Sequence, residues 1–290
     1  MTIQDALERA KQLRRTREGS PVPRADRSQA TLDDGSAVAV MREAGHAEPV
    51  PEVHYPKLGH VAFDSSTCEH FNVLVTDPQL ARAGGAAAAY RQLRSRVLHK
   101  SKAGNWSCLG ISSPGPGEGK TVTALNLAIS IAREKLRKVY LLDLDMRNPS
   151  VFERVGAQPP RPLAEFFTEA VPPESVLFET DLESLMVAGN RVQVPSASEL
   201  LASPRLDELL QYIRRRSPGA LIVVDLPPVL STDEALVVAP RVDAMFMVVS
   251  EGITRRDSLA KAIQLLSDFE VAGIIMNRSS EDAGSDYYGY

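Results

Sequence analysis

The 290-residue sequence predicts an α/β fold in which helices cover both faces of a mostly parallel sheet. Two observations lead to this prediction. Beyond residue 80, short apolar segments of strand length alternate with longer segments whose apolar residues recur at helical spacing. One of the apolar segments also runs directly into a glycine-rich loop that opens a helix-like segment. Strands that alternate with helices favour parallel pairing, because each crossover helix returns the chain to the same end of the sheet.

Each expected element is defined by its apolar pattern and by the polar, glycine or proline residues around it. The expected strands are 107–112, 138–143, 184–188, 221–225, 244–249 and 271–276. The expected helices are 86–98, 122–133, 204–216 and 255–269. In an open parallel sheet, ligands gather at the carboxyl ends of the strands, so candidate site residues are sought there.

The first 80 residues have a different character. Apolar residues between Ile3 and Leu13 recur at helical spacing among basic residues. They indicate a short helix that either contacts anionic lipid or a partner, or docks on its own domain. The polar, proline-marked stretch 19–56 is typical of a linker, and apolar pieces within 57–80 suggest an edge strand or a strap. We therefore expect a partly disordered N-terminal extension at 1–80, the main domain at 81–278 and a flexible tail at 279–290.

Composition and charge exclude several classes of protein. The net charge of −4 argues against nucleic acid as a partner. Cys68 and Cys108 have neither metal-binding nor redox spacing, which favours a reducing compartment without disulfides. No apolar run approaches the roughly 20 residues that span a bilayer, and no signal-peptide core is present at the N-terminus. We expect a cytoplasmic protein with no membrane span of its own.

A glycine-rich loop joins the strand-like segment that starts at Cys108 to the helix-like segment that follows Lys120. This is the context of a P-loop, in which backbone N–H groups turn inward around phosphate oxygens at a helix N-terminus. Lys120 would reach the β- and γ-phosphates of ATP, and the Thr121 hydroxyl would bind Mg²⁺. Pro114 stands where the usual pattern has its first glycine. The expected nucleotide-binding residues of the loop are Gly115, Pro116, Gly117, Glu118, Gly119, Lys120, Thr121 and Val122.

Two further apolar strands end in carboxylates. Asp143 and Asp145, with Arg147 after them, follow one strand, and Asp225 ends another and precedes two prolines. Carboxylate and hydroxyl oxygens suit Mg²⁺, which prefers hard ligands and retains several waters. The expected Mg²⁺ ligands are Thr121, Asp143, Asp145 and Asp225, and the expected catalytic residues are Lys120, Asp143, Asp145 and Arg147.

Three of the seven tyrosines lie in the last four positions, as Tyr287, Tyr288 and Tyr290. A chain terminus seldom contributes to a core, so hydroxyl-bearing rings in this place are candidate phosphate acceptors. The alternative is that the rings dock back on the domain and have a packing role. The predicted ATP site favours the first interpretation, because it would supply the phosphate.

Together these motifs resemble the bacterial tyrosine kinases of polysaccharide synthesis and export. The resemblance covers roughly residues 81 to 290 and rests on the P-loop, on Asp143-x-Asp145-x-Arg147, on Asp225-x-Pro-Pro and on the terminal tyrosines. It implies an ATP-dependent autokinase that transfers the γ-phosphoryl group to its own tail tyrosines, in trans between subunits, and so regulates a surface polysaccharide. It also implies that Asn277 lies near the adenine.

The same resemblance implies a membrane-embedded polysaccharide co-polymerase as activator, which would recruit the chain to the inner face of the plasma membrane. Members often carry a Glu-x-x-Arg-x-x-Arg helix that joins subunits in a ring. Here Arg91 and Arg94 are present, but Ala88 replaces the glutamate, so we expect a chain that is mostly monomeric or associates weakly.

The alternative is a P-loop ATPase switch or scaffold of the partitioning-ATPase type. Those ATPases carry an extra lysine five positions before the P-loop lysine, where this chain has Gly115. They also have no general need for a tyrosine tail, and both differences favour the kinase. The sequence does not distinguish which of Asp143 and Asp145 accepts the proton of the incoming tyrosine.

Overall fold

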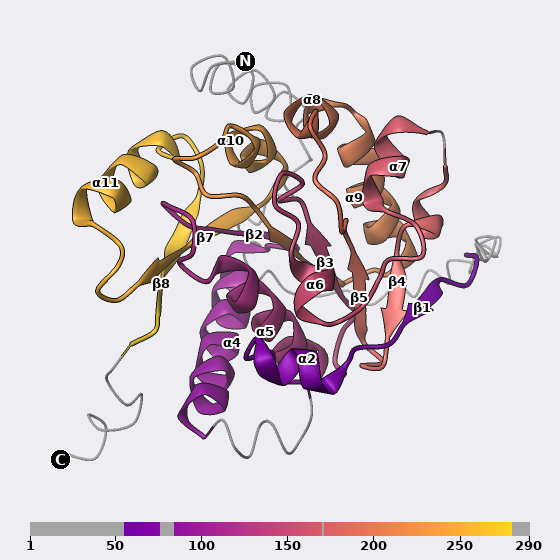
Figure 1. Ribbon diagram of the computed structural model, residues 1–290, viewed down its shortest axis with the longest axis horizontal. Coiled ribbons are helices and arrows are strands. Elements are labelled where there is room, and N and C mark those ends of the chain that lie inside the picture. Colours follow the sequence, from indigo (N-terminus) through magenta and orange to yellow (C-terminus); the bar gives the residue numbers. More distant parts are fainter. Residues whose placement is uncertain (1–54, 76–83, 170, 280–290) are drawn as a thin grey trace, which may run out of the picture.

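An eight-stranded sheet forms the centre of the protein, with helices on both of its faces (Figure 1). The computed structural model describes residues 55–75, 84–169 and 171–279. In spatial order the strands are β1 (Gly59–Val61), β4 (Phe178–Thr180), β5 (Leu185–Ala188), β3 (Val139–Asp143), β6 (Leu221–Asp225), β2 (Cys108–Ser112), β7 (Ala244–Ser250) and β8 (Val271–Asn277). The prediction of an α/β fold with a mostly parallel sheet is confirmed.

The six strands from β5 to β8 are all parallel. β4 pairs antiparallel with β5, and β1 then pairs parallel with β4 at the sheet edge. In the centre, Asp143 at the end of β3 is the register partner of Asp225 at the end of β6, which also pairs with Ile111 of β2. The carboxyl ends of three adjacent strands therefore coincide, and this alignment positions the candidate site.

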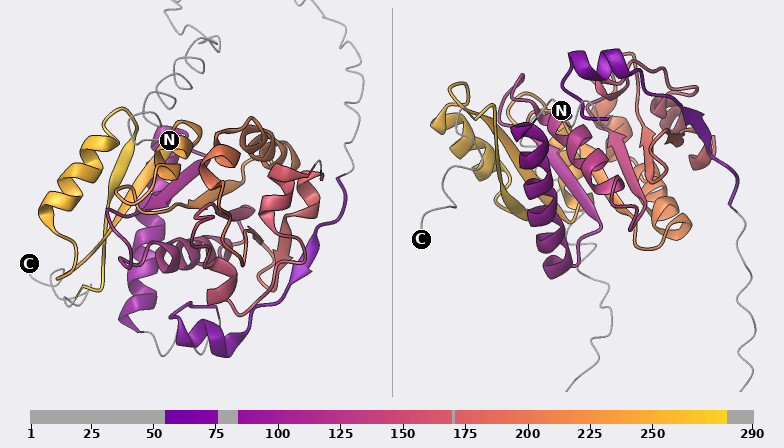
Figure 2. Two further views of the ribbon diagram at one scale, coloured as in Figure 1. Left: turned by 45° about the horizontal axis from the view of Figure 1, so that its top comes forward. Right: turned by 90° about the horizontal axis from the view of Figure 1, so that it is seen from below.

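Two helical layers enclose the sheet, as the further views in Figure 2 show. One face is covered by α2 (Ser65–His70), α4 (Gly85–Gly104), α5 (Lys120–Ala132) and α6 (Val151–Arg154). The other is covered by α7 (Leu163–Thr168), α8 (Ala197–Ala202), α9 (Arg205–Arg216), α10 (Glu234–Val238) and α11 (Arg256–Leu265). Short 3₁₀ turns lie at Pro173–Ser175 and Ala239–Arg241. Among the described residues no helix is both long and apolar enough to cross a membrane.

Helix α5 is the most enclosed helix next to the site. Every residue of it except Val122 is buried, because α5 packs on the sheet and is covered in turn by α4 and by residues 71–75. Asn126 fixes this covering segment, since its Oδ1 accepts from Leu74 N (2.8 Å) and its Nδ2 donates to Asn72 O (2.9 Å). The apolar pieces within 57–75 thus form both an edge strand and a strap over α5.

The expected strands and long helices are all present, with shifted ends. Helix α4 runs six residues past the expected end at 98, because its last turn is polar and is closed by Asn105 in the left-handed conformation (φ 54°). The sequence does not predict β4 or the short helices α2, α6, α7, α8 and α10, because their few residues carry too little periodicity to be recognised. The expected helix within residues 3–13, residues 19–54 of the expected linker and the tail tyrosines lie outside the described residues.

Replacing Asn126 with Leu should lower the free energy of unfolding by about 1–3 kcal/mol, because the buried N–H of Leu74 would lose its partner and the partly buried C=O of Asn72 would lose one as well. Urea denaturation of the full chain measures this difference. Ser95→Ala on the exposed side of α4 is the control, and should change stability by less than about 0.5 kcal/mol. Equal stability of the Asn126→Leu protein and the parent would show that the strap contributes nothing.

Candidate active site

The glycine-rich loop runs from the end of β2 to Lys120, the first residue of α5. Gly117 (φ 75°) and Gly119 (φ 93°) both adopt the left-handed conformation that favours glycine. A Cβ on Gly119 would also lie 1.9 Å from Nδ2 of Asn277. That Nδ2 donates to Glu118 O (3.0 Å), so the end of β8 contacts the loop directly. Glycine at 119 is therefore required both by the backbone and by the close approach of Asn277.

Glu118 fixes the shape of the loop from inside. Its Oε2 accepts from Gly115 N (3.1 Å) and its Oε1 accepts from the Thr254 hydroxyl (2.8 Å), which in turn accepts from Ser250 N. Thr254 is a supporting residue that sequence reasoning missed, because it lies 136 positions from Glu118. Pro114 fits its place without a positive φ, and its carbonyl accepts from Leu230 N (3.2 Å).

Lys120 lies among the carboxylates that follow β3 and β6. Its Nζ is 2.6 Å from Asp145 Oδ2 and 3.8 Å from Asp225 Oδ1, and it donates to the Thr121 hydroxyl (3.2 Å). Only 11% of the Lys120 side chain is exposed. The structure thus brings together Lys120, Thr121, Asp145 and Asp225, as the aligned strand ends require.

Asp143 is fully buried and held by backbone donors. Its Oδ2 accepts from Ser150 N (3.0 Å) and Val151 N (2.9 Å), and its Oδ1 accepts from Asp145 N (3.2 Å). Burial, and next the Asp225 carboxylate, raise the pKa of Asp143, although these backbone hydrogen bonds oppose the shift. The side chain therefore anchors the turn after β3 and contributes a strongly perturbed carboxyl group to the site.

The surroundings of Asp225 indicate whether the site suits Mg²⁺. It is fully buried, and neither carboxylate oxygen meets a hydrogen-bond donor in the part of the chain described. Burial raises the pKa of Asp225, and the charge of Lys120 opposes that rise. The two buried oxygens of Asp225, with the Lys120 ammonium 3.8 Å from Oδ1, and the Thr121 hydroxyl form a set of hard ligands that fits Mg²⁺. The described residues contain no self-sufficient group of three or more His, Cys, Asp or Glu ligands, so phosphate oxygens and waters would complete the coordination.

Arg147 forms an ion pair with a residue of α10. Its Nε donates to Oε1 of Glu234, a fully buried residue at the start of α10. This hydrogen bond, more than any other contact, raises the pKa of Arg147. Sequence reasoning missed Glu234, which carries no motif of its own, 87 positions from its partner. Arg147 thus connects the turn after β3 to α10, and its exposed remainder (44% of the side chain) lies at the surface.

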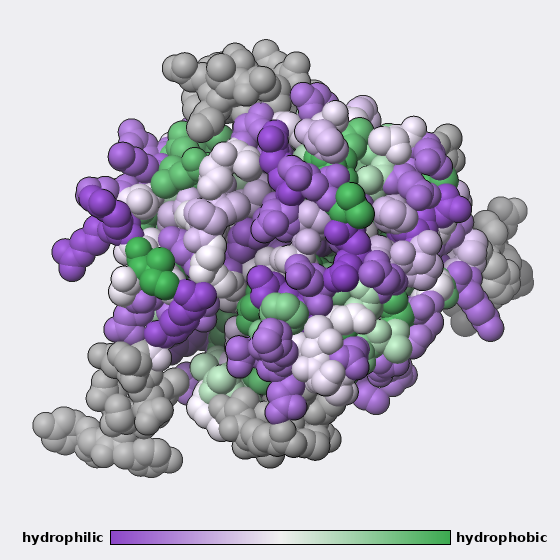
Figure 3. Space-filling model, viewed as in Figure 1, coloured by the Kyte–Doolittle hydropathy of each residue, from purple (hydrophilic) through white to green (hydrophobic). Residues whose placement is uncertain are grey.

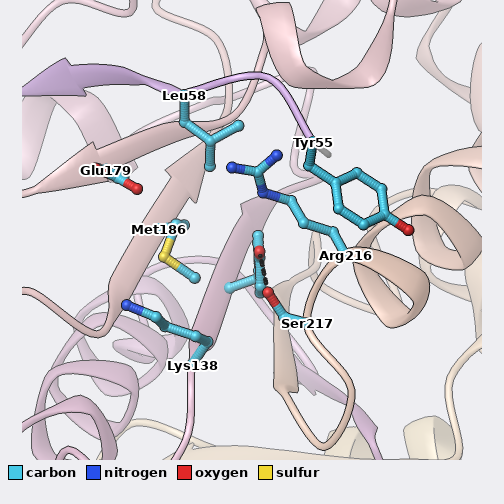
Figure 4. A pocket seen from close by; sticks show the side chains of 8 residues that line it. Tyr55, Leu58, Lys138, Glu179, Met186, Arg216 and Ser217 are labelled. Carbon is cyan, nitrogen blue, oxygen red and sulfur yellow. Dashed lines mark hydrogen bonds between the residues drawn. The ribbon is translucent and has the colours of Figure 1, made fainter. Parts of the chain in front are cut away.

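A cavity of about 190 Å³, shown in Figure 4, lies at the opposite ends of the strands. Lys138 and Ser217 precede β3 and β6, and Arg216 extends over the cavity between Leu58 and Met186. Its place at the amino ends of the strands separates it from the glycine-rich loop. It is therefore no part of the candidate active site.

The fold and the loop define the class of P-loop nucleotide-binding proteins. The chain belongs to the family described as ParA, the NUBPL iron-transfer P-loop NTPases, whose model matches residues 107–285. Cys68 and Cys108 are both buried, form no disulfide and lie on α2 and β2.

Similar proteins are named as tyrosine kinases. The tyrosine-protein kinase YwqD of Bacillus subtilis is 29% identical over 214 residues, which cover 69% of this chain and 85% of YwqD. The tyrosine-protein kinase CpsD of Streptococcus pneumoniae is 28% identical over 175 residues, which cover 59% of this chain and 75% of CpsD. The kinase domain of the Escherichia coli tyrosine kinase ETK superimposes with a TM-score of 0.61 at 26% identity, covering 69% and 79% of the two chains. The resemblance to the bacterial tyrosine kinases is confirmed.

Replacing Lys120 with Met should destabilise the protein more at pH 8 than at pH 5. The fold raises the pKa of Asp143 and Asp225, so it favours their protonated forms. That contribution is present below the ordinary carboxyl pKa of about 4 and is lost as the pH rises through the raised values. The positive charge of Lys120 lowers the pKa of both carboxyl groups. Without it, each carboxylate becomes more costly to bury in its charged form, and this cost lowers the free energy of unfolding most at pH 8.

Denaturant unfolding without Mg²⁺ or nucleotide measures the effect. The expected loss at pH 8 is about 3–5 kcal/mol, as for one partner removed from a buried ion pair. Lys135→Met is the control, since Lys135 forms only an exposed pair with Glu183 (3.0 Å). If Lys120→Met lowered the free energy of unfolding equally at pH 5 and pH 8, Lys120 would not compensate the charges of Asp143 and Asp225.

Proposed function

We propose that the protein is an ATP-dependent tyrosine autokinase that phosphorylates the tyrosines of its own C-terminal tail. The observation that supports this most is the convergence of Asp143 and Asp145 on Lys120 and Thr121 at the mouth of the P-loop. The P-loop supplies the phosphate site, and the acidic motif that follows β3 supplies a proton acceptor beside it. The relatives named as tyrosine kinases support the same conclusion.

The reaction follows from the chemistry of these groups. The tyrosine oxygen attacks the γ-phosphorus, the bond from that phosphorus to the bridging β–γ oxygen breaks, ADP leaves, and the phenol proton passes to a carboxylate. Lys120 neutralises charge on the transferred group, and Mg²⁺, held by Thr121 and Asp225, would supply further charge stabilisation when bound. A phenol has a pKa of about 10, so an acceptor for its proton is needed at neutral pH.

Geometry favours Asp145 as that acceptor. Lys120 contacts Asp145 at 2.6 Å, and it must leave this carboxylate to reach the phosphates of a bound nucleotide. Its departure would free Asp145 Oδ2 at the mouth of the site. Asp143 has the raised pKa expected of a base, but it is fully buried and both of its oxygens accept backbone N–H groups. A base must first reach the proton that it abstracts, so we assign Asp143 to positioning.

The acceptors are Tyr287, Tyr288 and Tyr290. Three phosphates would add roughly −5 to −6 charges, and these would repel the tail from a mouth lined by carboxylates. Phosphorylation would thereby end the occupancy of the site by the tail. We further propose that transfer occurs between subunits, and that the cycle regulates a surface polysaccharide through a membrane-embedded partner, with the chain recruited to the inner face of the plasma membrane.

A partitioning-type ATPase is the second candidate, because the family model that matches residues 107–285 is named for ParA. Gly115 occupies the position of the extra lysine of those ATPases, and its N–H is held by Glu118. The loop therefore offers no second lysine to the phosphates. Phosphotyrosine detection after incubation with ATP and Mg²⁺ separates the two functions, since ATP hydrolysis alone would leave the tail unmodified.

Truncation after Arg278 should remove nearly all phosphotyrosine and preserve nucleotide binding. Tyr140 is 1% exposed, and burial raises the pKa of both Tyr90 and Tyr140, so neither hydroxyl is a ready acceptor. Mass spectrometry of the labelled full chain locates the phosphate. Tyr287→Phe alone is the control and should leave label on the other two tail tyrosines. Most of the label on Tyr55, Tyr90, Tyr140 or Tyr212 would refute the tail as substrate.

Replacing Ala88 with Glu should tighten self-association, by analogy with the ring helix that the sequence resembles. Within the chain Arg94 already binds Glu134 (2.9 Å) and Ser130 O (3.0 Å), whereas Arg91 is exposed. Arg91 of another subunit is therefore the better partner for a new glutamate, and one exposed pair contributes under about 1 kcal/mol. Sedimentation velocity with ADP and Mg²⁺ measures the change, and a stable ring of the parent at low micromolar concentration would show that Ala88 does not limit assembly.

A further inference from the structure

A cavity of about 250 Å³ lies beside the candidate active site, between the segments 158–164 and 190–194. Its walls include Pro159, Pro162, Val192 and Val194, which are apolar, and the proline nitrogens offer no hydrogen-bond donor. Its polar lining residues are Gln158, Asn190, Arg191 and Gln193. The exposed area of the cavity is mainly apolar, and three side-chain amides and one guanidinium supply its polar groups.

The loop that lines this cavity is fixed to the catalytic motif at both of its ends. Gly189 follows β5 and lies so close to Asp143 that a Cβ on it would be 2.8 Å from the Asp143 Cβ. At the other end, Val194 N donates to Met146 O (2.8 Å), one residue before Arg147. The cavity is thus held at a constant place relative to Asp143 and Asp145.

The polar atoms of the cavity are not all used within the fold. Asn190 is 1% exposed, and its Oδ1 accepts from Ala164 N (2.9 Å), but its buried Nδ2 has no partner in the described chain. Arg191 is exposed and forms no ion pair with any described carboxylate. Val192 is also 76% exposed, although it is apolar. An unsatisfied amide donor, a free cation and an exposed apolar side chain in three consecutive residues together suggest a ligand.

The order of strands in the sheet shows on which side of the active site a ligand in this cavity would lie. The P-loop follows β2, Asn277 ends β8 beyond β7, and Gly189 follows β5 beyond β6 and β3. A nucleotide whose phosphates occupy the P-loop and whose base lies toward Asn277 leaves the β3–β5 side open. The cavity is on that side, where the acceptor must approach Asp145.

We propose that this cavity docks the acceptor tail by holding the ring of a tyrosine next to the one in the active site. The proposal rests on the proposed kinase function. The occupant is the segment 286–290, whose sequence is Asp-Tyr-Tyr-Gly-Tyr. A tyrosine ring suits apolar walls with a hydrogen-bond donor, because its hydroxyl accepts as well as donates. Asp286, directly before the tyrosines, carries the charge that complements Arg191.

The experiment measures transfer to a synthetic peptide of residues 280–290. The enzyme is the full chain with Tyr287, Tyr288 and Tyr290 each replaced by Ser, so that its own tail neither accepts phosphate nor presents a ring. Val192→Asp should raise the KM for the peptide roughly tenfold, as for one lost pocket contact, with kcat and nucleotide affinity little changed. Because Val192 is exposed, the substitution leaves the fold intact.

Leu136→Asp is the matched control. Leu136 is also an exposed apolar residue (81%), but it precedes β3 at the opposite ends of the strands, so the KM should stay at the parent value. Arg191→Glu should raise the KM for the natural peptide, and a peptide with Asp286→Arg should restore it. This compensation distinguishes a direct contact from a general disturbance of the loop.

Two results would overturn the docking site. One is an unchanged KM in the Val192→Asp enzyme, and the other is an Arg191→Glu effect that the Asp286→Arg peptide does not reverse. Failure of the kinase function has a different signature, since no phosphotyrosine would then form on the parent chain or on any peptide. In that case anisotropy of a fluorescent 280–290 peptide still tests docking, and equal affinity for the parent and Val192→Asp proteins would reject it.

Discussion

The buried contact between Lys120 and the carboxylates at the ends of β3 and β6 is the interaction on which the site depends. One ammonium group lies among Asp143, Asp145 and Asp225, all nearly inaccessible to solvent. Charges so placed lose their hydration, and removal of one partner leaves the others uncompensated. The arrangement exists because β2, β3 and β6 are adjacent and in register, so that their carboxyl ends and the start of α5 meet at one point.

Nucleotide binding would exchange one set of partners for another. In the structure Lys120 neutralises aspartates, whereas with ATP bound it would neutralise phosphates, and Asp145 would be released for proton transfer. The elements that carry these groups are among the most enclosed in the protein, since α5 is buried on nearly all sides. The exchange therefore concerns side chains on a rigid frame, which keeps the reacting groups in place while their charges are redistributed.

The frame by itself does not distinguish a kinase from an ATPase. A P-loop and a strand-borne aspartate are shared by proteins with different chemistry, so function has to be argued from the site. Here the differences are local: Gly115 in place of a second lysine, a second acidic motif that reaches Lys120, and tyrosines at the end of the chain. The mainly apolar cavity lined by Pro159 and Val192 would add a place for an aromatic acceptor. Elsewhere Figure 3 shows a face that is largely hydrophilic, with apolar residues in separate small groups.

The fold class, the long strands and helices, and the P-loop with its acidic neighbours can all be predicted from the amino-acid sequence, because they depend on local periodicity and on motifs of a few residues. The partners of those motifs become visible in the folded chain alone. Three of these contacts join residues 87 to 159 positions apart: Glu118 with Thr254, Asn277 with Glu118, and Arg147 with Glu234. Such pairs are set by the order of strands in the sheet and by the crossovers between them. That order is a property of the packed chain as a whole, and no short segment of sequence encodes it.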